Sequence, residues 1–305
     1  MSEPLAPPRV ALAPISWGVC EVPGWGTVPA APVVLSAMAS LGVTATEFGP
    51  PGYLPTDPAA ARALLDSYGL RGIGGFLALP LHRDPAAAIR AARATVTGFA
   101  AAGAEILILA AATGLSGYDT RPELTEGQWR TLIATAGAVA ELAAAHGLRT
   151  VVHPHVGTHV ETEYDIERFL ADSPLSLCLD TGHLLVGGTD PLLLARRHRD
   201  RVGHVHLKDV RLGLLDDIAS GALGYTEAVR AGLYPPLGDG DLDVAGLLDL
   251  LAEGDYAGWY VLEQDTALGP RDTVDAPTRD AARSLDHLGR ILRGRRGADG
   301  RELVR

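Results

Sequence analysis

The stretch RTVVHPHVGTHVETEYDIERFLADSPLSLCLDTGHLLVGGTDPLLLARRHRDRVGHVHLKDVR, residues 149–211, carries the pattern that decides the fold. Three short aliphatic runs alternate with two amphipathic segments. The runs lie at 149–155, 175–180 and 202–208, and the amphipathic segments at 161–170 and 191–199. Such alternation is typical of parallel strands joined by helices, because each helix returns the chain to the same end of the sheet.

The same alternation continues on both sides of this stretch. Further strands are predicted at 10–16, 44–48, 72–81, 105–110 and 259–263, and further helices at 33–41, 58–68, 85–102, 126–146 and 276–293. Eight strands and their helices fit a closed (β/α)8 TIM barrel, whose active site lies at the C-terminal ends of the strands. An open doubly wound sheet is the alternative. The first strand-to-helix turn, SWGVCEVPGWG, lacks the Gly-x-Gly-x-x-Gly arrangement, and no Gly-Lys-Ser/Thr occurs, so nucleotide binding is disfavoured.

We expect one domain over residues 1–305. At 305 residues and 47% hydrophobic, the chain can bury a large aliphatic core. The segment 212–243, which contains YPPLGDGDLD, is too short for a domain and is predicted to be a loop insertion over the barrel mouth. The Gly/Arg-rich residues 294–305 are predicted to form a flexible tail.

Charge and composition exclude several classes of protein. With 26 Lys and Arg residues against 37 Asp and Glu residues, the net charge is −11, which argues against nucleic acid or an anionic membrane as a partner. No apolar stretch is long enough to span a bilayer, and MSEPLAPPRV does not resemble a secretory signal, so a cytoplasmic protein is expected. Cys20 and Cys178 are predicted to be reduced core residues.

Polar side chains gather where strands five to eight end. Seven of the ten histidines lie between residues 153 and 206. The strand-end residues are His153 and His155, Asp180, His204 and His206, and Glu263. Since alternate residues of a strand share a face, two imidazoles and two carboxylates from four strands can converge. Such ligands suit Mn, Co, Zn or Fe(II) more than Ca or Mg. The alternative is a buried polar network without metal.

Five segments resemble a known family. HPHVGTHVETEYDIERFL, LDTGHLLVGGTDP, RVGHVHLKDVR, AVRAGLYPPLGDGDLDV and GWYVLEQD are similar to the inosose dehydratases, within the xylose-isomerase-like sugar isomerase and epimerase superfamily. The resemblance implies a TIM barrel with a divalent metal, with Mn or Co in first place and Zn, Fe or Mg as alternatives. It further implies a hydro-lyase that dehydrates 2-keto-myo-inositol (scyllo-inosose) or a related keto-cyclitol.

The resemblance also implies roles for single residues. The superfamily's usual metal ligands on strands five to eight are Glu, Asp, His and Glu, and the matching residues are His153, Asp180, His206 and Glu263. Epimerases of this group use the first and last Glu as a pair, so a histidine in the first position fits the dehydratases better. His183 would contact a substrate oxygen, and Arg211 would bind substrate.

The hypothesised reaction removes a proton beside a ketone and then expels the β-hydroxyl as water. A divalent ion would stabilise the enolate. Glu263, His153 and Lys208 are candidates for the base, the lysine if a nearby cation lowers its pKa. His155 or His183 could act as the general acid near neutral pH.

Two residues earlier in the chain are weaker candidates for substrate binding. Trp17, after the first predicted strand, could stack on a sugar ring or lie in the core. Glu47, at the end of the second, could hydrogen-bond polyol hydroxyls or form a surface salt bridge. Lys208 could instead pair with its neighbour Asp209.

Other functions stay open at this point. The segment AAATGLSGYDTRPEL matches the dehydratase pattern poorly, so a sugar isomerase or epimerase, or a keto-glycoside lyase, is the alternative enzyme. A non-catalytic sugar-binding barrel would have no reason to bring Asp180, His206 and Glu263 together. Related endonucleases need a basic DNA-binding face, which a net charge of −11 disfavours. The expected partner is a small polyol ketone or sugar, a homo-oligomer is compatible with the sequence, and the need for a thiol cofactor stays open.

Overall fold

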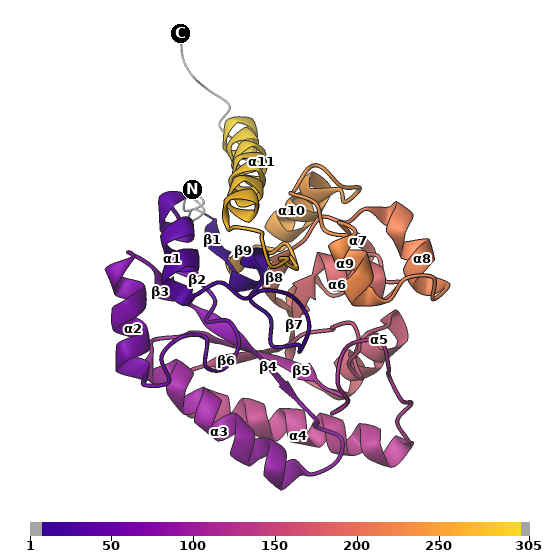
Figure 1. The fold of residues 1–305 in the computed structure, drawn as a ribbon. Coiled ribbons are helices and arrows are strands. Elements are labelled where there is room, and N and C mark those ends of the chain that lie inside the picture. The colour runs from indigo at the N-terminus through magenta and orange to yellow at the C-terminus, as the bar shows by residue number, and fades with distance from the viewer. Residues whose placement is uncertain (1–7, 300–305) are drawn as a thin grey trace.

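The computed structural model describes residues 8–299, which fold around one parallel sheet (Figure 1). The strands follow the order β3-β2-β1-β9-β8-β7-β6-β5-β4, and neighbouring strands are parallel. Their bounds are β1 (Arg9–Leu12), β2 (Ala45–Thr46), β3 (Arg71–Gly72), β4 (Gly74–Leu79), β5 (Ile106–Ala111), β6 (Arg149–Val152), β7 (Ser176–Asp180), β8 (Val202–Leu207) and β9 (Trp259–Leu262).

The barrel closes at Ile73. This residue separates β3 from β4, so the two short strands are halves of the third predicted strand. The Ile73 N–H donates to the Thr46 carbonyl on one side (3.0 Å), and the Ile73 carbonyl accepts from the N–H groups of Glu105 (2.8 Å) and Ile106 (3.1 Å) on the other. One continuous segment therefore joins both ends of the sheet, which confirms the predicted (β/α)8 TIM barrel.

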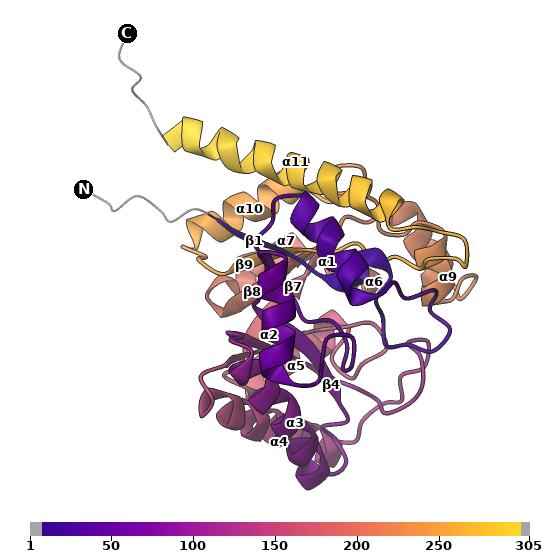
Figure 2. The same ribbon diagram turned by 60° about the vertical axis from the view of Figure 1, so that its left-hand side comes forward.

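Helices surround the strands, with α3 and α4 side by side on the opposite side of the barrel from α11 (Figures 1 and 2). Three of them begin at an Asp-Pro pair, where Asp57, Asp84 or Asp190 caps the first backbone N–H groups and proline takes the first helical position. The helices are α1 (Ala31–Ser40), α2 (Pro58–Ser67), α3 (Pro85–Ala101), α4 (Glu126–Ala144), α5 (Glu163–Asp172), α6 (Thr181–Val186), α7 (Pro191–Arg197), α8 (Leu215–Ala219), α9 (Tyr225–Arg230), α10 (Val244–Glu253) and α11 (Asp275–Asp299).

The barrel interior contains its own apolar cluster, separate from the larger core between strands and helices. Its buried members are Ala11, Ala13, Ala45, Ile73, Ile106, Ile108, Val151, Cys178, Trp259 and Val261. Because inward-facing residues of a strand are spaced by two, His153, Asp180 and Glu263 follow Val151, Cys178 and Val261 on the same face. The cluster therefore forms the layer of side chains next to the polar residues in the barrel interior.

Several predicted segments differ from the structure. The first strand ends at Leu12, and a 3-10 helix (Pro14–Trp17) replaces residues 14–16 of it. The segment 212–243 contains a 3-10 helix (Leu212–Leu214), α8 and α9, and the helix α10 after it was not predicted. Residues 294–299, which were predicted to belong to a flexible tail, continue α11, and 300–305 lie outside the described residues.

Two further sequence predictions concern the cysteines and the membrane. Cys178 is buried inside the barrel as predicted, whereas Cys20 is only partly buried and lines a cavity, so its assignment to the core was wrong. Both are free thiols. None of the helices within residues 8–299 is both long and apolar enough to cross a bilayer.

Candidate active site

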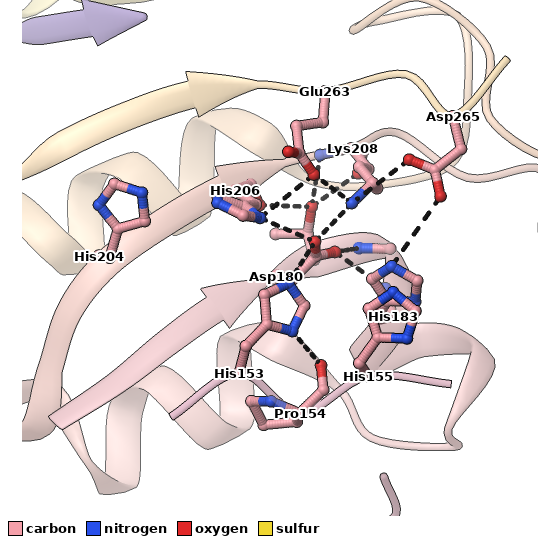
Figure 3. A network of polar contacts seen from close by, with 12 residues as sticks. His153, Pro154, His155, Asp180, His183, His204, His206, Lys208, Glu263 and Asp265 are labelled. Carbon is pink, nitrogen blue, oxygen red and sulfur yellow. Dashed lines mark hydrogen bonds and ion pairs between the residues drawn. The ribbon is translucent and has the colours of Figure 1, made fainter. Parts of the chain in front are cut away.

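A cavity of about 440 Å³ opens at the C-terminal ends of the strands. The polar residues of strands five to eight converge there, as the spacing predicted, and an aromatic wall faces them. The polar lining includes Glu47, His153, His155, His183, His206, Lys208, Glu263 and Asp265, and the aromatic lining includes Trp25, Phe76, Tyr118 and Tyr225. Figure 3 shows the polar side chains pointing toward one another from β7, β8, β9 and the loop after β6.

Asp180 lies at the centre of this group. It ends β7, and its Oδ1 atom accepts hydrogen bonds from the first backbone N–H groups of α6, which orients the carboxylate. Its Oδ2 atom is 3.4 Å from His153 Nε2, 3.3 Å from His206 Nδ1 and 2.6 Å from Lys208 Nζ. The side chains are buried, so these charges interact more strongly than they would at the protein surface.

The donor atoms around Asp180 suit a divalent metal ion. His206 Nδ1 is buried without a hydrogen-bond partner among the described residues, although it lies 3.1 Å from Glu263 Oε2. The ligand atoms of Asp180, His206 and Glu263 lie within 4.8 Å of one another, as do those of His153, Asp180 and His183. One imidazole nitrogen beside two carboxylate oxygens is a donor set typical of transition metals.

Lys208 supplies the positive charge of the cluster. Its ammonium contacts Asp180 and Glu263 and is 3.5 Å from Asp265 Oδ1. Burial lowers the pKa of Lys208, but these carboxylates outweigh it and raise the pKa well above its usual range. Burial raises the pKa of Asp180, but the Lys208 ammonium holds it well below its usual range. The lowering of the lysine pKa, which the sequence leads us to expect beside a bound cation, stays a prediction.

His155 and His183 form the side of the cavity next to the cluster. Their ring centroids are 3.7 Å apart. Burial, followed by the charge of His153, lowers the pKa of His155 to about 3, and burial holds the pKa of His183 well below its usual value. Both rings are therefore neutral near pH 7, which opposes the prediction that either donates a proton as an imidazolium. Their neutral nitrogens remain available for substrate oxygens.

Asp265 and two tyrosines complete the site and were not predicted. The Tyr225 hydroxyl donates to Asp265 Oδ2 (2.9 Å) and lies 3.1 Å from the Tyr234 hydroxyl. Burial raises the pKa of Asp265 to about 6. Asp265 follows Glu263 by two residues, so the alternation applied to the other strands could have found it. Tyr225 lies on α9, within the segment 212–243, and no local sequence pattern marked it.

Asp209 anchors the segment 212–243 and does not pair with Lys208. Its Oδ2 accepts hydrogen bonds from the backbone N–H groups of Gly238 (2.8 Å) and Gly240 (3.0 Å), and its Oδ1 from those of Val210 (2.9 Å) and Leu242 (3.0 Å). One buried carboxylate therefore holds the turn near the C-terminal end of the segment 212–243.

We expect Asp209→Ala to lower the free energy of unfolding by roughly 2 to 4 kcal/mol, because buried N–H groups lose their acceptor. The segment 212–243 should become sensitive to trypsin, and KM should rise because Tyr225 is held less firmly. Urea unfolding, limited proteolysis and steady-state kinetics measure these effects. Asp209→Asn retains one of the two acceptor oxygens and should show a smaller change. Protease resistance equal to that of the wild type would contradict this anchoring role.

Two predicted substrate-binding residues lie elsewhere. Trp17 is fully buried in the core, where its Nε1 donates to Thr278 Oγ1 (3.0 Å), because the 3-10 helix turns it toward α11. Arg211 is exposed and its guanidinium donates to the Gly232 carbonyl within the segment 212–243. Neither lines the cavity. Glu47 does line it, but its carboxylate contacts two histidines instead of a surface partner.

Comparisons with known proteins define the class. A family model described as xylose isomerase-like TIM barrel matches residues 35–291. An inosose dehydratase from Geobacillus kaustophilus is 35% identical over 284 residues, which cover 88% of this chain and 91% of the relative. The rhizopine catabolism protein MocC from Rhizobium meliloti is 33% identical over 267 residues, covering 84% and 81%. The chain belongs to the inosose dehydratase family of the xylose isomerase-like barrels, which confirms the resemblance found in the sequence.

Solved structures resemble the fold at lower identity. An L-ribulose 3-epimerase superimposes with a TM-score of 0.69 and 18% identity, over 97% of this chain and 100% of that one. A D-allulose 3-epimerase from Methylomonas sp., in complex with D-allulose, gives a TM-score of 0.67 and 17% identity over 93% and 97%. At these identities the likeness establishes the barrel and leaves the reaction open.

Proposed function

We propose that the protein is a metal-dependent hydro-lyase that removes water from 2-keto-myo-inositol or a related keto-cyclitol. The observation that carries the proposal is the convergence of Asp180, His206 and Glu263 at the barrel mouth, in a chain 35% identical to an inosose dehydratase. The cavity of about 440 Å³ is of a size that suits a six-membered polyol ring. Its neutral imidazoles can hydrogen-bond the hydroxyls of such a ring.

Asp180, His206 and Glu263 would hold the ion, with His153 as the fourth ligand. We place Mn or Co first and Zn, Fe or Mg as alternatives, because imidazole and carboxylate together suit these ions. When bound, such an ion polarises a carbonyl oxygen and stabilises the negative charge that deprotonation of the neighbouring carbon creates. The His206 Nδ1 atom supports this assignment because it lies 3.1 Å from Glu263 Oε2 and 3.3 Å from Asp180 Oδ2, where one ion could bind all three atoms.

The remaining residues would bind substrate and move protons. Lys208 contacts Glu263 directly, so a proton taken up by either group can pass to the other. His153 is the other candidate for the base. Its Nδ1 lies 2.7 Å from the Pro154 carbonyl, so its Nε2 would serve either as the base or as the fourth ligand of the ion, and not as both. His155 and His183 would bind substrate hydroxyls through neutral nitrogens.

Mass spectrometry of scyllo-inosose incubated with the Mn-loaded protein in deuterated water tests the function. We expect the loss of one water molecule, dependent on added metal, with protein dialysed against a chelator as the control. Deuterium uptake without loss of water would show the alternative, an isomerase or epimerase. An unchanged substrate would exclude this ketone and direct the same assay to keto-glycosides and free ketoses.

Three expectations from the sequence stay predictions: a single domain over residues 1–305, a cytoplasmic location and a homo-oligomeric state.

A further inference from the structure

We propose that Glu47 is a positioning residue that holds the His206 ring in the one orientation and tautomer in which its Nδ1 can bind a metal ion. The inference rests on the proposed function, since it concerns a histidine that we assign to the metal. It gives Glu47 a different role from the substrate binding that the sequence suggested.

The carboxylate of Glu47 reaches across the barrel. Glu47 follows β2 directly, and its backbone N–H donates to the Leu12 carbonyl of β1 (3.1 Å). Its buried Oε1 atom lies 2.9 Å from His204 Nε2 and 3.0 Å from His206 Nε2, both on β8. In Figure 3, His206 faces Asp180 and Glu263, and His204 lies beyond it on the same strand. One oxygen atom therefore fixes two imidazole rings.

This contact determines where the hydrogen of His206 lies. A carboxylate accepts hydrogen bonds, so the Nε2 atoms of His204 and His206 must donate to Glu47. In a neutral imidazole with hydrogen on Nε2, the Nδ1 atom keeps its lone pair. The Nδ1 atom of His206 is buried and faces Glu263 Oε2 at 3.1 Å and Asp180 Oδ2 at 3.3 Å, so in this tautomer its lone pair points to where an ion would bind.

Without Glu47, the opposite tautomer of His206 would be favoured. Its Nδ1 lies 3.1 Å from Glu263 Oε2 and 3.3 Å from Asp180 Oδ2. Without a partner for Nε2, the ring would carry its hydrogen on Nδ1 and donate a hydrogen bond to one of these carboxylates. That hydrogen would occupy the lone pair that a metal ion needs. A carboxylate behind a ligating histidine orients the ring and raises its basicity, and the loss of such partners typically lowers metal affinity 10- to 100-fold.

Calorimetric titration of the metal-free protein with MnCl2 tests the inference without an activity measurement. We expect Glu47→Ala to raise the Kd for Mn by about 10- to 100-fold. Glu47→Gln keeps the size of the side chain and one acceptor oxygen but loses the charge, so an intermediate Kd is expected. Thr46→Val is the matched control, because Thr46 is a buried neighbour on β2 whose hydroxyl donates only to the Glu47 backbone carbonyl (2.9 Å). Its Kd should equal that of the wild type.

Proton NMR of the Co-loaded protein gives a second readout. The Nε2 hydrogen of His206 should appear as a paramagnetically shifted signal that exchanges slowly with water in the wild type, because Glu47 accepts it in a buried position. In Glu47→Gln and Glu47→Ala this signal should exchange faster. A merely structural role would lower Tm and leave the exchange unchanged.

The outcomes separate this inference from the proposed function. A wild-type protein that binds neither Mn nor Co, Zn, Fe or Mg in the same titration would overturn the metal assignment and the role of Glu47 together. Wild-type Kd values in both Glu47 variants would overturn the inference alone. A raised KM with an unchanged Kd for Mn would also overturn it, by assigning Glu47 to the substrate.

Discussion

The His206→Ala and Glu263→Ala variants are expected to lose bound metal and activity together while the barrel stays folded. Each removes one donor from a group whose ligand atoms lie within 4.8 Å of one another. Since a bound ion supplies several kcal/mol of charge stabilisation, kcat/KM should fall by roughly 10³-fold or more. Metal content by inductively coupled plasma mass spectrometry, steady-state kinetics and circular dichroism measure the three parts of the result.

His198→Ala is the matched control for these variants. His198 also contacts a carboxylate, with its Nε2 2.8 Å from Glu167 Oε2, but it lies at the end of α7 and away from the cavity. Its metal content and kcat/KM should equal those of the wild type. Stoichiometric metal and full activity in both His206→Ala and Glu263→Ala would show that these residues are not ligands.

The Lys208→Met variant is expected to make the protein depend on metal for its stability. In the metal-free protein the Lys208 ammonium contacts the carboxylates of Asp180, Glu263 and Asp265 and offsets part of their negative charge, and removing a buried partner typically costs about 3 to 5 kcal/mol. A bound metal ion would compete with the ammonium for the carboxylate oxygens of Asp180 and Glu263. Without the ammonium, added Mn should therefore raise Tm by more than it does in the wild type. If Lys208 moves a proton in the reaction, kcat should fall by about 10²- to 10⁴-fold.

Thermal unfolding with and without MnCl2 measures the stability effect. Lys208→Arg keeps the positive charge, so its metal-free Tm should lie closer to that of the wild type. An equal rise in Tm for Lys208→Met and the wild type would show that the ammonium and the ion do not share these oxygens. Wild-type kcat in the metal-loaded Lys208→Met variant would exclude the lysine from the proton transfer.

Local sequence patterns were sufficient to predict the barrel and the convergence of the polar residues. Strand and helix periodicities depend on neighbouring residues, so they marked the strand ends at His153, Asp180 and Glu263. Parallel strands then place their C-terminal ends at one rim, whatever the side chains are. The same reasoning failed at Trp17, because the 3-10 helix that starts at Pro14 ends the strand early and turns the indole into the core.

Contacts between distant strands could not be predicted in this way. Glu47 and His206 are 159 residues apart, and their contact exists only because β2 and β8 enclose the same interior. Tyr225 reaches Asp265 from the segment 212–243, which Asp209 holds through its backbone partners. Such contacts depend on three-dimensional packing, because no sequence period links the residues that make them.

The register between β7 and β8 is the clearest case. Leu177 is opposite Val202, but Cys178 is opposite His204, so Gly203 is an extra residue that forms a bulge. A Cβ atom at Gly203 would lie 2.8 Å from Ser176 Cβ, which explains why a glycine fits there. The sequence alone determined which residues reach the rim. The bulge, a property of two packed strands, places His206 opposite Asp180, since a slip of one residue turns every side chain to the other face of the sheet.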